Sequence, residues 1–362
     1  MNKKFWKDKK ILITGHTGFK GGWLSVFLNL IDAKVSGFAL NPVGKYNFFN
    51  KVGVKKILKN DIRHNITDLK VLKSSIKKIK PEIIFHLAAQ SSVIESFKSP
   101  INTISSNIIG TSNILESIKF DKNVKCLIII TTDKVYQNYK IKKHFDENSR
   151  LGGDDVYSGS KASCEIIVNS YRKSFFQKSN CKIATVRAGN CFGGGDWTKD
   201  RIVKDALESF SNNRKLTLRK PDATRPWQHV IEPLYGYILL AEKLCSKNGK
   251  KFAKAWNFGP STAQNMKVIN LVKIIKKKMK TRSKIIINRN FKKINNNVKI
   301  FESKYLNIDS SKVFKALNWS PMLSIEKSVD LTIEWHKKFI KKENLLKITK
   351  IQILEYLKKI NL

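Results

Sequence analysis

Tyr157 and Lys161 stand four positions apart in a segment that is expected to open a helix running to about residue 176. Residues four apart share one face of a helix, so the phenol and the ammonium are expected to lie together. An ammonium near a phenol favours the phenolate, which would let Tyr157 act as a base near neutral pH. Such a pair is common by chance, so its meaning depends on the segments around it.

A second polar group follows an apolar run at residues 125–130, where Thr132, Asp133 and Lys134 come in succession. Parallel sheets bury their strands on both faces and place ligands beyond the carboxyl ends of the strands. These three side chains are therefore expected to lie where chemistry can occur. A capped turn that merely ends the strand is the alternative.

Three glycines near the start of the chain indicate a nucleotide site. Gly15, Gly18 and Gly21 follow a short β-branched run and lead into an apolar helix start at residues 23–28. This is the spacing of a dinucleotide fingerprint, which permits a tight turn, close approach of the pyrophosphate and packing of helix on strand. A glycine-rich hairpin is the alternative. A phosphate-transfer loop is disfavoured, because it needs Ser or Thr after its lysine, whereas Gly21 follows Lys20.

Further stretches could complete such a site. Residues 34–40 are expected to form a second strand, which ends at Asn41 rather than at the acidic residue that often binds the ribose hydroxyls of NAD. Because no arginine stands at that position, we expect NAD rather than NADP. Asp61 could face the adenine, or could belong to a helix N-cap region. Residues 81–90 are expected to form a buried strand opening into small residues, where the backbone could lie against a cofactor.

Strand and helix patterns alternate along the first half of the chain, with helical spacing at residues 69–79 and 101–118. This alternation favours an α/β fold, a doubly wound parallel sheet of the Rossmann type. We expect residues 1–188 to form this domain, rejoined by about residues 223–262, of which 255–259 return as a strand.

The rest of the chain is expected to form a smaller C-terminal substrate-binding part, mainly residues 189–342. Helical patterns occupy residues 266–280 and 324–341, whereas the Lys- and Asn-rich residues 292–299 are expected to form a loop. Residues 343–362 are an amphipathic stretch of Lys, Leu and Ile, which we expect to be a surface helix or an oligomer contact.

The formal net charge of +42 would ordinarily indicate a nucleic-acid or other anionic partner. Lysine greatly outnumbers arginine, the better residue for bidentate phosphate contacts, and the lysines are spread along the chain. The accompanying excess of Ile and Asn is what an AT-rich genome would impose. We therefore expect no nucleic-acid partner, although an anionic substrate such as a sugar nucleotide would benefit from the field.

Cysteine usage and hydropathy predict a cytoplasmic protein. The five cysteines are odd in number and form no CxxC pair, which argues against a disulfide framework or a zinc site, and we expect no metal. The apolar run after the basic N-terminal residues, 11–13, is too short for a signal-peptide core. No stretch of the sequence approaches the roughly eighteen apolar residues of a membrane span, so we expect no membrane partner.

With these motifs, the chain resembles the extended short-chain dehydrogenase/reductase family, the NAD-dependent epimerases and dehydratases. Within that family the resemblance is greatest to the CDP-glucose 4,6-dehydratases. The stretches that carry it are residues 15–21 (GHTGFKG), 131–134 (TTDK), 187–197 (RAGNCFGGGDW) and 225–230 (RPWQHV).

The resemblance implies where a cofactor and a substrate would bind. The implied NAD-binding residues are Gly15, Thr17, Gly18, Phe19, Gly21, Asp61, Ile62, Leu87, Ala88, Ala89, Tyr157 and Lys161. The implied substrate-binding residues are Gln90, Asn190, Asp196, Trp197, Arg201, Arg225, Trp227 and His229. Arg201 and Arg225 are candidates for the diphosphate or the sugar, and arginine beside tryptophan also suits a nucleotide diphosphate and its base on chemical grounds.

The resemblance also implies a hydro-lyase that converts CDP-glucose to CDP-4-keto-6-deoxyglucose and water through an internal hydride cycle on bound NAD. In this cycle Tyr157 removes the O4 proton, Lys161 holds the ribose and lowers the phenol pKa, and Thr132 binds near O4. Asp133 and Lys134 share the elimination of water. Related dehydratases carry Asp-Glu after the threonine, Asp-Lys is the CDP-glucose variant, and the family's sugar epimerases generally lack such a pair.

Other functions stay open. The chain could be a 4,6-dehydratase acting on GDP-mannose or dTDP-glucose, a 4-epimerase, or a non-enzymatic basic protein that binds nucleotides or nucleic acid on the same fold. The favoured activity would belong to deoxysugar and surface-polysaccharide biosynthesis, such as that of lipopolysaccharide O-antigen. We also expect a homo-oligomer, either a dimer or a tetramer.

If the net charge of +42 reflects genome composition, the protein should bind random duplex DNA weakly at physiological salt, and this binding should fall steeply as salt rises. Fluorescence anisotropy of a labelled duplex at several salt concentrations measures the effect. Tight, sequence-selective binding at physiological salt would overturn this interpretation.

Overall fold

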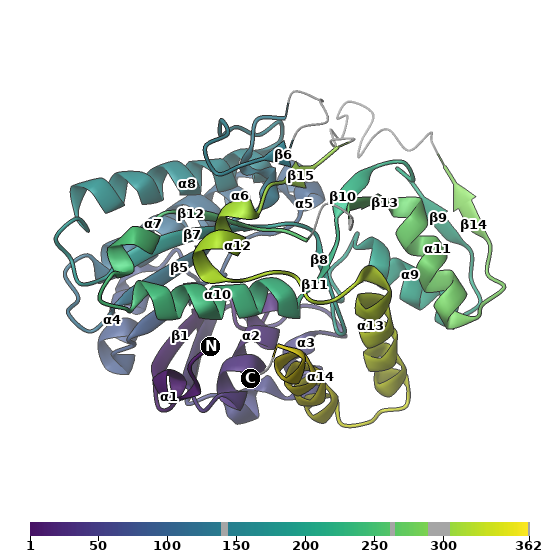
Figure 1. Cartoon of the computed structure of the whole chain (residues 1–362), viewed down its shortest axis with the longest axis horizontal. Coiled ribbons are helices and arrows are strands. Elements are labelled where there is room, and N and C mark those ends of the chain that lie inside the picture. Colours follow the sequence, from purple (N-terminus) through teal and green to yellow (C-terminus); the bar gives the residue numbers. More distant parts are fainter. Residues whose placement is uncertain (139–143, 261–264, 289–304, 361–362) are drawn as a thin grey trace.

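The structure is a computed structural model that describes residues 1–138, 144–260, 265–288 and 305–360. Seven parallel strands form its central sheet, in the order β12-β7-β5-β4-β1-β2-β3 (Figure 1). They are β1 (Lys10–Thr14), β2 (Lys34–Ala39), β3 (Asn60–Arg63), β4 (Ile83–His86), β5 (Cys126–Ile130), β7 (Lys182–Ala188) and β12 (Ala255–Phe258). The expected doubly wound α/β fold is confirmed, including the return of β12 beside β7.

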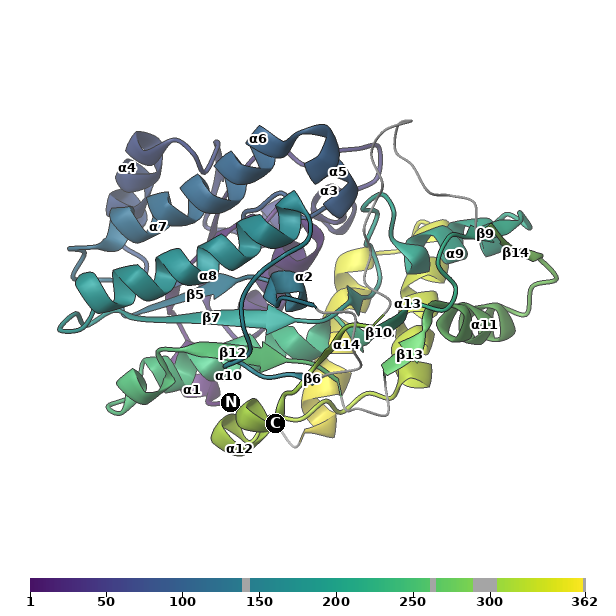
Figure 2. The same cartoon turned by 90° about the horizontal axis from the view of Figure 1, so that it is seen from above.

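The sheet is buried on both faces because successive strand residues are apolar. Ile11 of β1 and Ile128 of β5 belong to one core, whereas the adjacent Leu12 and Leu127 belong to the other. Helices α2 (Phe19–Leu30) and α10 (Ile231–Leu244) cover the first face, and the second is covered by α4 (Leu69–Ile79), α7 (Gly110–Ile118) and α8 (Val156–Ser174) (Figure 2).

The predicted helix at residues 69–79 is confirmed as α4, and the one predicted at 101–118 is interrupted by a π-helical turn. That turn, η2 (Ser105–Ile109), joins α6 (Pro100–Ile104) to α7. Short elements elsewhere connect the main ones. These are α1 (Lys3–Trp6), α3 (Phe48–Val52), η1 (Val54–Ile57), α5 (Val93–Lys98), η3 (Asp133–Val135), β6 (His144–Phe145), η4 (Gly249–Phe252), β15 (Asn307–Ile308) and α12 (Ser311–Leu317).

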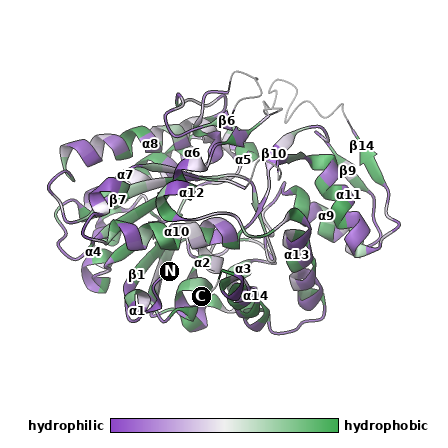
Figure 3. Ribbon diagram, in the orientation of Figure 1, coloured by the Kyte–Doolittle hydropathy of each residue, from purple (hydrophilic) through white to green (hydrophobic). Residues whose placement is uncertain are grey.

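The chain after β7 builds a second, smaller core beside the sheet. Buried residues such as Phe210, Leu271 and Val329 come together there from three helices. Its elements are β8 (Cys191–Phe192), α9 (Ile202–Ser211), β9 (Leu216–Leu218), β10 (Thr224–Pro226), β11 (Gln228–His229), β13 (Asn265–Lys267), α11 (Val268–Met279), β14 (Ile285–Ile287) and α13 (Ile325–Ile340). Figure 3 shows hydrophilic residues along α8 and α13, whereas β1 is largely hydrophobic. The loop predicted at 292–299 lies outside the described residues.

The C-terminal tail forms a helix, as predicted, and is attached more firmly than its sequence indicates. Helix α14 (Leu345–Lys359) packs one face on the protein, where Ile353, Tyr356 and Leu357 belong to the main core beside α2, and exposes the other, including Ile351 and Leu354. Glu232 of α10 explains its attachment. One carboxylate oxygen of Glu232 accepts the Tyr356 hydroxyl at 2.6 Å, and the other accepts the backbone N–H groups of residues 322 and 323 at 2.8 and 2.6 Å.

Replacing Tyr356 with Phe should lower the free energy of unfolding by about 1.5–3 kcal/mol, because it removes a buried hydrogen bond to a carboxylate. Denaturant unfolding followed by circular dichroism measures the change. Tyr235→Phe is the matched control, since its ring contacts that of Tyr356 but the described residues give its hydroxyl no hydrogen bond. It should change stability by less than about 0.5 kcal/mol, and an equal loss in both variants would contradict the assignment.

Candidate active site

One large cavity, of about 670 Å³, opens at the carboxyl edge of the sheet. Its wall includes the first residue after each of six parallel strands. These residues are Gly15, Leu40, His64, Leu87, Thr131 and Gly189. The strand order reverses direction between β1 and β4, which is the topological switch point where α/β sheets bind their ligands.

The glycine turn forms one wall of the cavity and fits a dinucleotide. Gly15 has φ +77°, and a Cβ at this position would lie 2.6 Å from the backbone nitrogen of Ala88. A Cβ on Gly21 would collide with the Gly15 carbonyl. Helix α2 begins at Phe19 with no side-chain cap and no acidic residue in its first turn, so its N-terminal N–H groups are suited to a pyrophosphate.

The expected cofactor residues Thr17, Gly18, Phe19, Leu87, Ala88 and Ala89 also line this cavity, but Asp61 and Ile62 do not. The carboxylate of Asp61 instead binds His16 Nε2 at 2.8 Å and Arg63 Nη2 at 2.9 Å. Asp61 therefore lies beside the glycine turn, where its histidine engages the carboxylate, but does not line the cavity. The wall after β3 is made by residues 64–66, which sequence reasoning missed although the strand-end rule applies to them as well.

All the expected catalytic side chains meet in this cavity. Thr132, Asp133 and Lys134 follow β5, and Tyr157 and Lys161 lie on the first turns of α8. The Thr132 hydroxyl donates to Asp133 Oδ1 at 3.1 Å. Asp133 is 2% exposed, and its Oδ2 has no hydrogen-bond partner among the described residues. A buried carboxylate oxygen without a protein partner is available to a substrate.

The electrostatics of Tyr157 differ from the expectation. Burial raises the pKa of Tyr157, while a hydrogen bond with Thr132 and the charge of Arg201 lower it, and Asp133 and Asp155 raise it. The net effect of the protein is a raised pKa, because burial outweighs the groups that favour the phenolate. The Lys161 ammonium donates to the carbonyl of Ile130 at 3.2 Å.

Lys161 is itself buried, and burial lowers its pKa. Cys164 and Glu165 act to raise this pKa, whereas Lys20 lowers it further. Lys20 belongs to the glycine turn and also lines the cavity, although sequence reasoning assigned it no role.

A smaller cavity of about 160 Å³ adjoins the large one and holds most of the expected substrate residues. Asn190, Asp196, Arg201 and Arg225 line both cavities, Gln90 lines only the large one, and Trp197 and Trp227 line only the small one. Arg219 and Lys220, which the sequence reasoning missed, also line both. The passage between the cavities is therefore rich in cations.

The structure places His229 in the core rather than at the wall of a cavity. It lines neither cavity and is fully buried, with its ring 5.7 Å from that of Trp23 and 6.3 Å from that of Phe192. Strand β11 pairs with β8, which places His229 opposite Phe192 in the core. Burial lowers the pKa of His229 to about 3, so the imidazole is neutral.

Aromatic side chains fix the glycine-rich loop that separates the cavities. A Cβ on Gly194 would collide with the indole of Trp335, and the Trp23 Nε1 donates to the Gly194 carbonyl at 2.9 Å. Trp23 belongs to α2 and Trp335 to α13, and both are part of the main core, so the loop is anchored to that core.

No group of three or more His, Cys, Asp or Glu side chains in the described ranges is arranged to hold a metal ion. Within the same part of the chain, none of the helices combines the length and the apolar character that crossing a bilayer requires.

Comparison with known proteins gives this geometry its context. The sequence model of the GDP-mannose 4,6 dehydratase family matches residues 12–332. The chain belongs to this family of NAD-dependent nucleotide-sugar 4,6-dehydratases. The CDP-glucose 4,6-dehydratase of Salmonella typhimurium is a relative of 38% identity, and the match covers 99% of this chain and 98% of that protein.

Solved structures share the fold of this family member. The dTDP-glucose 4,6-dehydratase of Bacillus anthracis in complex with NAD superposes with a TM-score of 0.76 at 20% identity, covering 93% of this chain and 99% of that one. The UDP-glucose 4-epimerase of Thermotoga maritima with UDP-glucose gives a TM-score of 0.78 at 21% identity, covering 91% and 99%. At these identities, the likeness concerns the fold alone.

Replacing Asp155 with Asn should move the ascending limb of the kcat/KM profile to lower pH, because the Asp155 charge raises the pKa of Tyr157. Asparagine keeps the N-cap of α8, where Asp155 accepts from the Ser158 N–H at 2.9 Å. A screened charge interaction of about 0.2–1 kcal/mol corresponds to a shift of about 0.1–0.7 pH unit. Asp68→Asn, the same change at the N-cap of α4, should leave the limb in place. A limb that stays fixed in Asp155→Asn would contradict the assignment of Tyr157 as the base.

Proposed function

We propose that this protein is an NAD-dependent CDP-glucose 4,6-dehydratase. The observation that carries the proposal is that Asp133 and Lys134 line the same cavity as Thr132, Tyr157 and Lys161. The 38% identity over nearly the whole of both chains to a CDP-glucose 4,6-dehydratase supports it. A 4-epimerase needs no second acid/base pair beside its tyrosine, so this pair favours dehydration.

The glycine turn, the N-terminus of α2 and Lys161 would hold NAD, which when bound supplies a hydride acceptor and donor beside the sugar. Tyr157 takes the proton from O4 while hydride leaves C4, and the Thr132 hydroxyl binds near O4. Because burial raises the pKa of Tyr157, the free protein holds the phenol protonated over a wider pH range. The cationic charge of Arg201 and of the oxidised nicotinamide must therefore favour the phenolate.

The elimination step falls to the residues after β5. A ketone at C4 acidifies the hydrogen on C5, and either Lys134 or Asp133 removes that proton while the other assists departure of the C6 hydroxyl as water. Hydride would then return to C6, and the residue that removed the C5 proton would return it to C5, giving CDP-4-keto-6-deoxyglucose. The unpartnered Oδ2 of Asp133 supports direct contact with the substrate.

The cationic passage between the cavities would bind the diphosphate of the substrate. Arg201, Arg219, Lys220 and Arg225 line it, and Arg219 is oriented by an ion pair with Asp200 at 3.1 Å. Arginine binds phosphate oxygens with two parallel hydrogen bonds. The glucosyl unit would then lie toward Tyr157 and the nucleoside toward Trp227.

Incubating the NAD-loaded protein separately with CDP-glucose, GDP-mannose, dTDP-glucose and UDP-glucose tests the proposal. We expect loss of one water from CDP-glucose, read by mass spectrometry, at least about tenfold faster than from the others, a preference of about 1.4 kcal/mol. Preferred dehydration of another sugar nucleotide would reassign the substrate. A product of unchanged mass would indicate an epimerase.

Replacing Lys134 with Met should spare hydride transfer from the substrate but slow the loss of water, by about a hundredfold if Lys134 acts in acid/base catalysis. Reduced nicotinamide should therefore accumulate with CDP-glucose, which absorbance measures. The C5 hydrogen should also stop exchanging with solvent deuterium. Lys173→Met, at an exposed position near the end of α8, is the control and should behave as the unmodified enzyme. Normal turnover in Lys134→Met would remove Lys134 from the mechanism.

We further propose a cytoplasmic homo-oligomer, a dimer or tetramer, that serves deoxysugar and surface-polysaccharide biosynthesis. Exposed isoleucines on neighbouring helices support self-association, since contiguous apolar surface marks interaction sites. Ile101 and Ile104 of α6 and Ile166 of α8 are 73%, 38% and 57% exposed. Light scattering coupled to size exclusion measures the number of subunits.

A further inference from the structure

Glu165 and Arg187 form a buried ion pair behind the large cavity, and no step of the proposed reaction uses it. Glu165 lies on α8 one turn after Lys161, Arg187 lies on β7, and each residue is 3% exposed. Arg187 Nε donates to one carboxylate oxygen at 3.0 Å and Nη2 to the other at 2.9 Å. This bidentate geometry fixes the orientation of both groups as well as their separation.

The carboxylate also holds the end of β5. The Thr131 hydroxyl donates to Glu165 Oε1 at 2.6 Å, and the Thr185 hydroxyl donates to Oε2 at 2.6 Å. Each oxygen of Glu165 therefore accepts two hydrogen bonds. Because Thr131 directly precedes Thr132, this contact sets the position of the catalytic strand end relative to α8.

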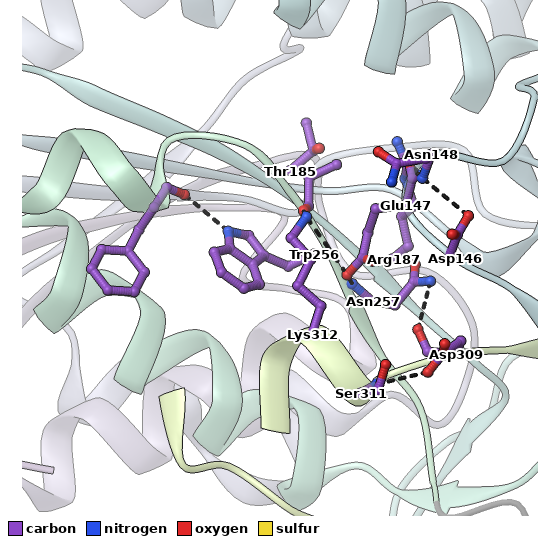
Figure 4. Close-up of polar contacts among 12 residues, drawn as sticks. Asp146, Glu147, Asn148, Thr185, Arg187, Trp256, Asn257, Asp309, Ser311 and Lys312 are labelled. Carbon is purple, nitrogen blue, oxygen red and sulfur yellow. Dashed lines mark hydrogen bonds and ion pairs between the residues drawn. The ribbon is translucent and has the colours of Figure 1, made fainter. Parts of the chain in front are cut away.

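The guanidinium extends the contact to the turn that carries Asp133 and Lys134. Arg187 Nη1 donates to the Tyr136 hydroxyl at 2.9 Å and to the carbonyl of Glu147 at 3.3 Å. The Tyr136 hydroxyl in turn donates to Asn257 of β12 at 2.6 Å. Figure 4 shows Arg187 beside Glu147 and Asn257 in this network.

The charges of Glu165 and Arg187 stabilise each other. Burial raises the pKa of Glu165, but the Arg187 charge and the hydrogen bonds from Arg187, Thr131 and Thr185 lower it below its usual value, so the carboxylate stays ionised. Arg172 and Lys161 are the other cations that interact with Glu165. A buried ion pair is often no more stabilising than apolar residues of similar volume, so the occurrence of this pair suggests a role in geometry.

We propose that Glu165 and Arg187 are positioning residues that hold Thr132 and Asp133 at the end of β5 in register with Tyr157 and Lys161 on α8. The inference rests on the proposed function, because it assigns these four residues to one reaction. Neither Glu165 nor Arg187 lines the cavity, so their effect on the reaction passes through the residues that they hold.

Glu165→Gln in the NAD-loaded enzyme tests the proposal. We expect kcat to fall about a hundredfold, the effect of a misplacement near 1 Å. KM should change less than about threefold, because the cations proposed to bind the diphosphate lie elsewhere. The pH range over which kcat/KM is high should also become narrower at both ends. The ascending limb of the profile should move to higher pH as Tyr157 loses the hydrogen bond with Thr132, and the descending limb to lower pH as Lys161 loses the charge of Glu165.

Glu232→Gln is the matched control, because Glu232 is another buried carboxylate that accepts several hydrogen bonds but lies outside the cavity. It should lower stability without moving either limb. If Glu165→Gln does not fold, Thr185→Val removes one hydrogen bond to Glu165 but keeps its charge. It should move the ascending limb in the same direction and leave the descending limb in place, with about a threefold loss of kcat. The proposal would be overturned if a folded variant, Glu165→Gln or Thr185→Val, kept its ascending limb in place and had a kcat within twofold of that of the parent enzyme.

Hydrogen exchange separates this inference from the proposed function, because it needs no substrate. Glu165→Gln should speed amide exchange at residues 130–136 relative to Glu232→Gln in the NAD-loaded protein. Turnover of the parent enzyme on CDP-glucose tests the proposed function alone. Unchanged exchange at residues 130–136 would reject the positioning role whatever sugar nucleotide the parent enzyme uses.

Discussion

The close approach of Gly15 to the backbone after β4 is the constraint on which the rest of the site depends. Only glycine fits at position 15, since a Cβ would lie 2.6 Å from the Ala88 nitrogen. This contact lets β1 and β4 lie adjacent at the point where the strand order reverses. The parallel register then brings the residues after six strands to one edge, so side chains far apart in sequence share a cavity of about 670 Å³.

Sequence reasoning succeeded where a local pattern determines the outcome. The glycine turn, the polar residues after β5 and the Tyr157–Lys161 spacing each specify a position within a strand–turn–helix unit, and parallel strand ends meet at one edge. It did not predict positions that are decided by a partner distant in sequence. His229 is buried by Trp23 and Phe192, and Asp61 is engaged by His16, which no spacing within either segment indicates. The attachment of the tail was not predicted, because it depends on Glu232 of α10.

The net charge of the chain and the positive charge of the site come from different residue types. The excess over neutrality is mainly lysine spread along the sequence, whereas three of the four cations in the passage between the cavities are Arg201, Arg219 and Arg225. Arginine is the residue that recognises phosphate geometry, and lysine is a compact, strongly hydrated charge. The arrangement therefore agrees with selective binding of one diphosphate rather than with general affinity for polyanions.

The packing of α14 on α2 also bears on how the protein is synthesised. Trp23, Leu24 and Phe27 of α2 belong to the same buried core as Ile353 and Tyr356 of α14, although more than three hundred residues separate the two helices. Domains generally fold from the N-terminus as the chain leaves the ribosome. Here the nascent chain exposes the face of α2 that packs on α14 until α14 itself has been synthesised. During that interval, the exposed face of α2 is a binding site for chaperones that recognise apolar surface.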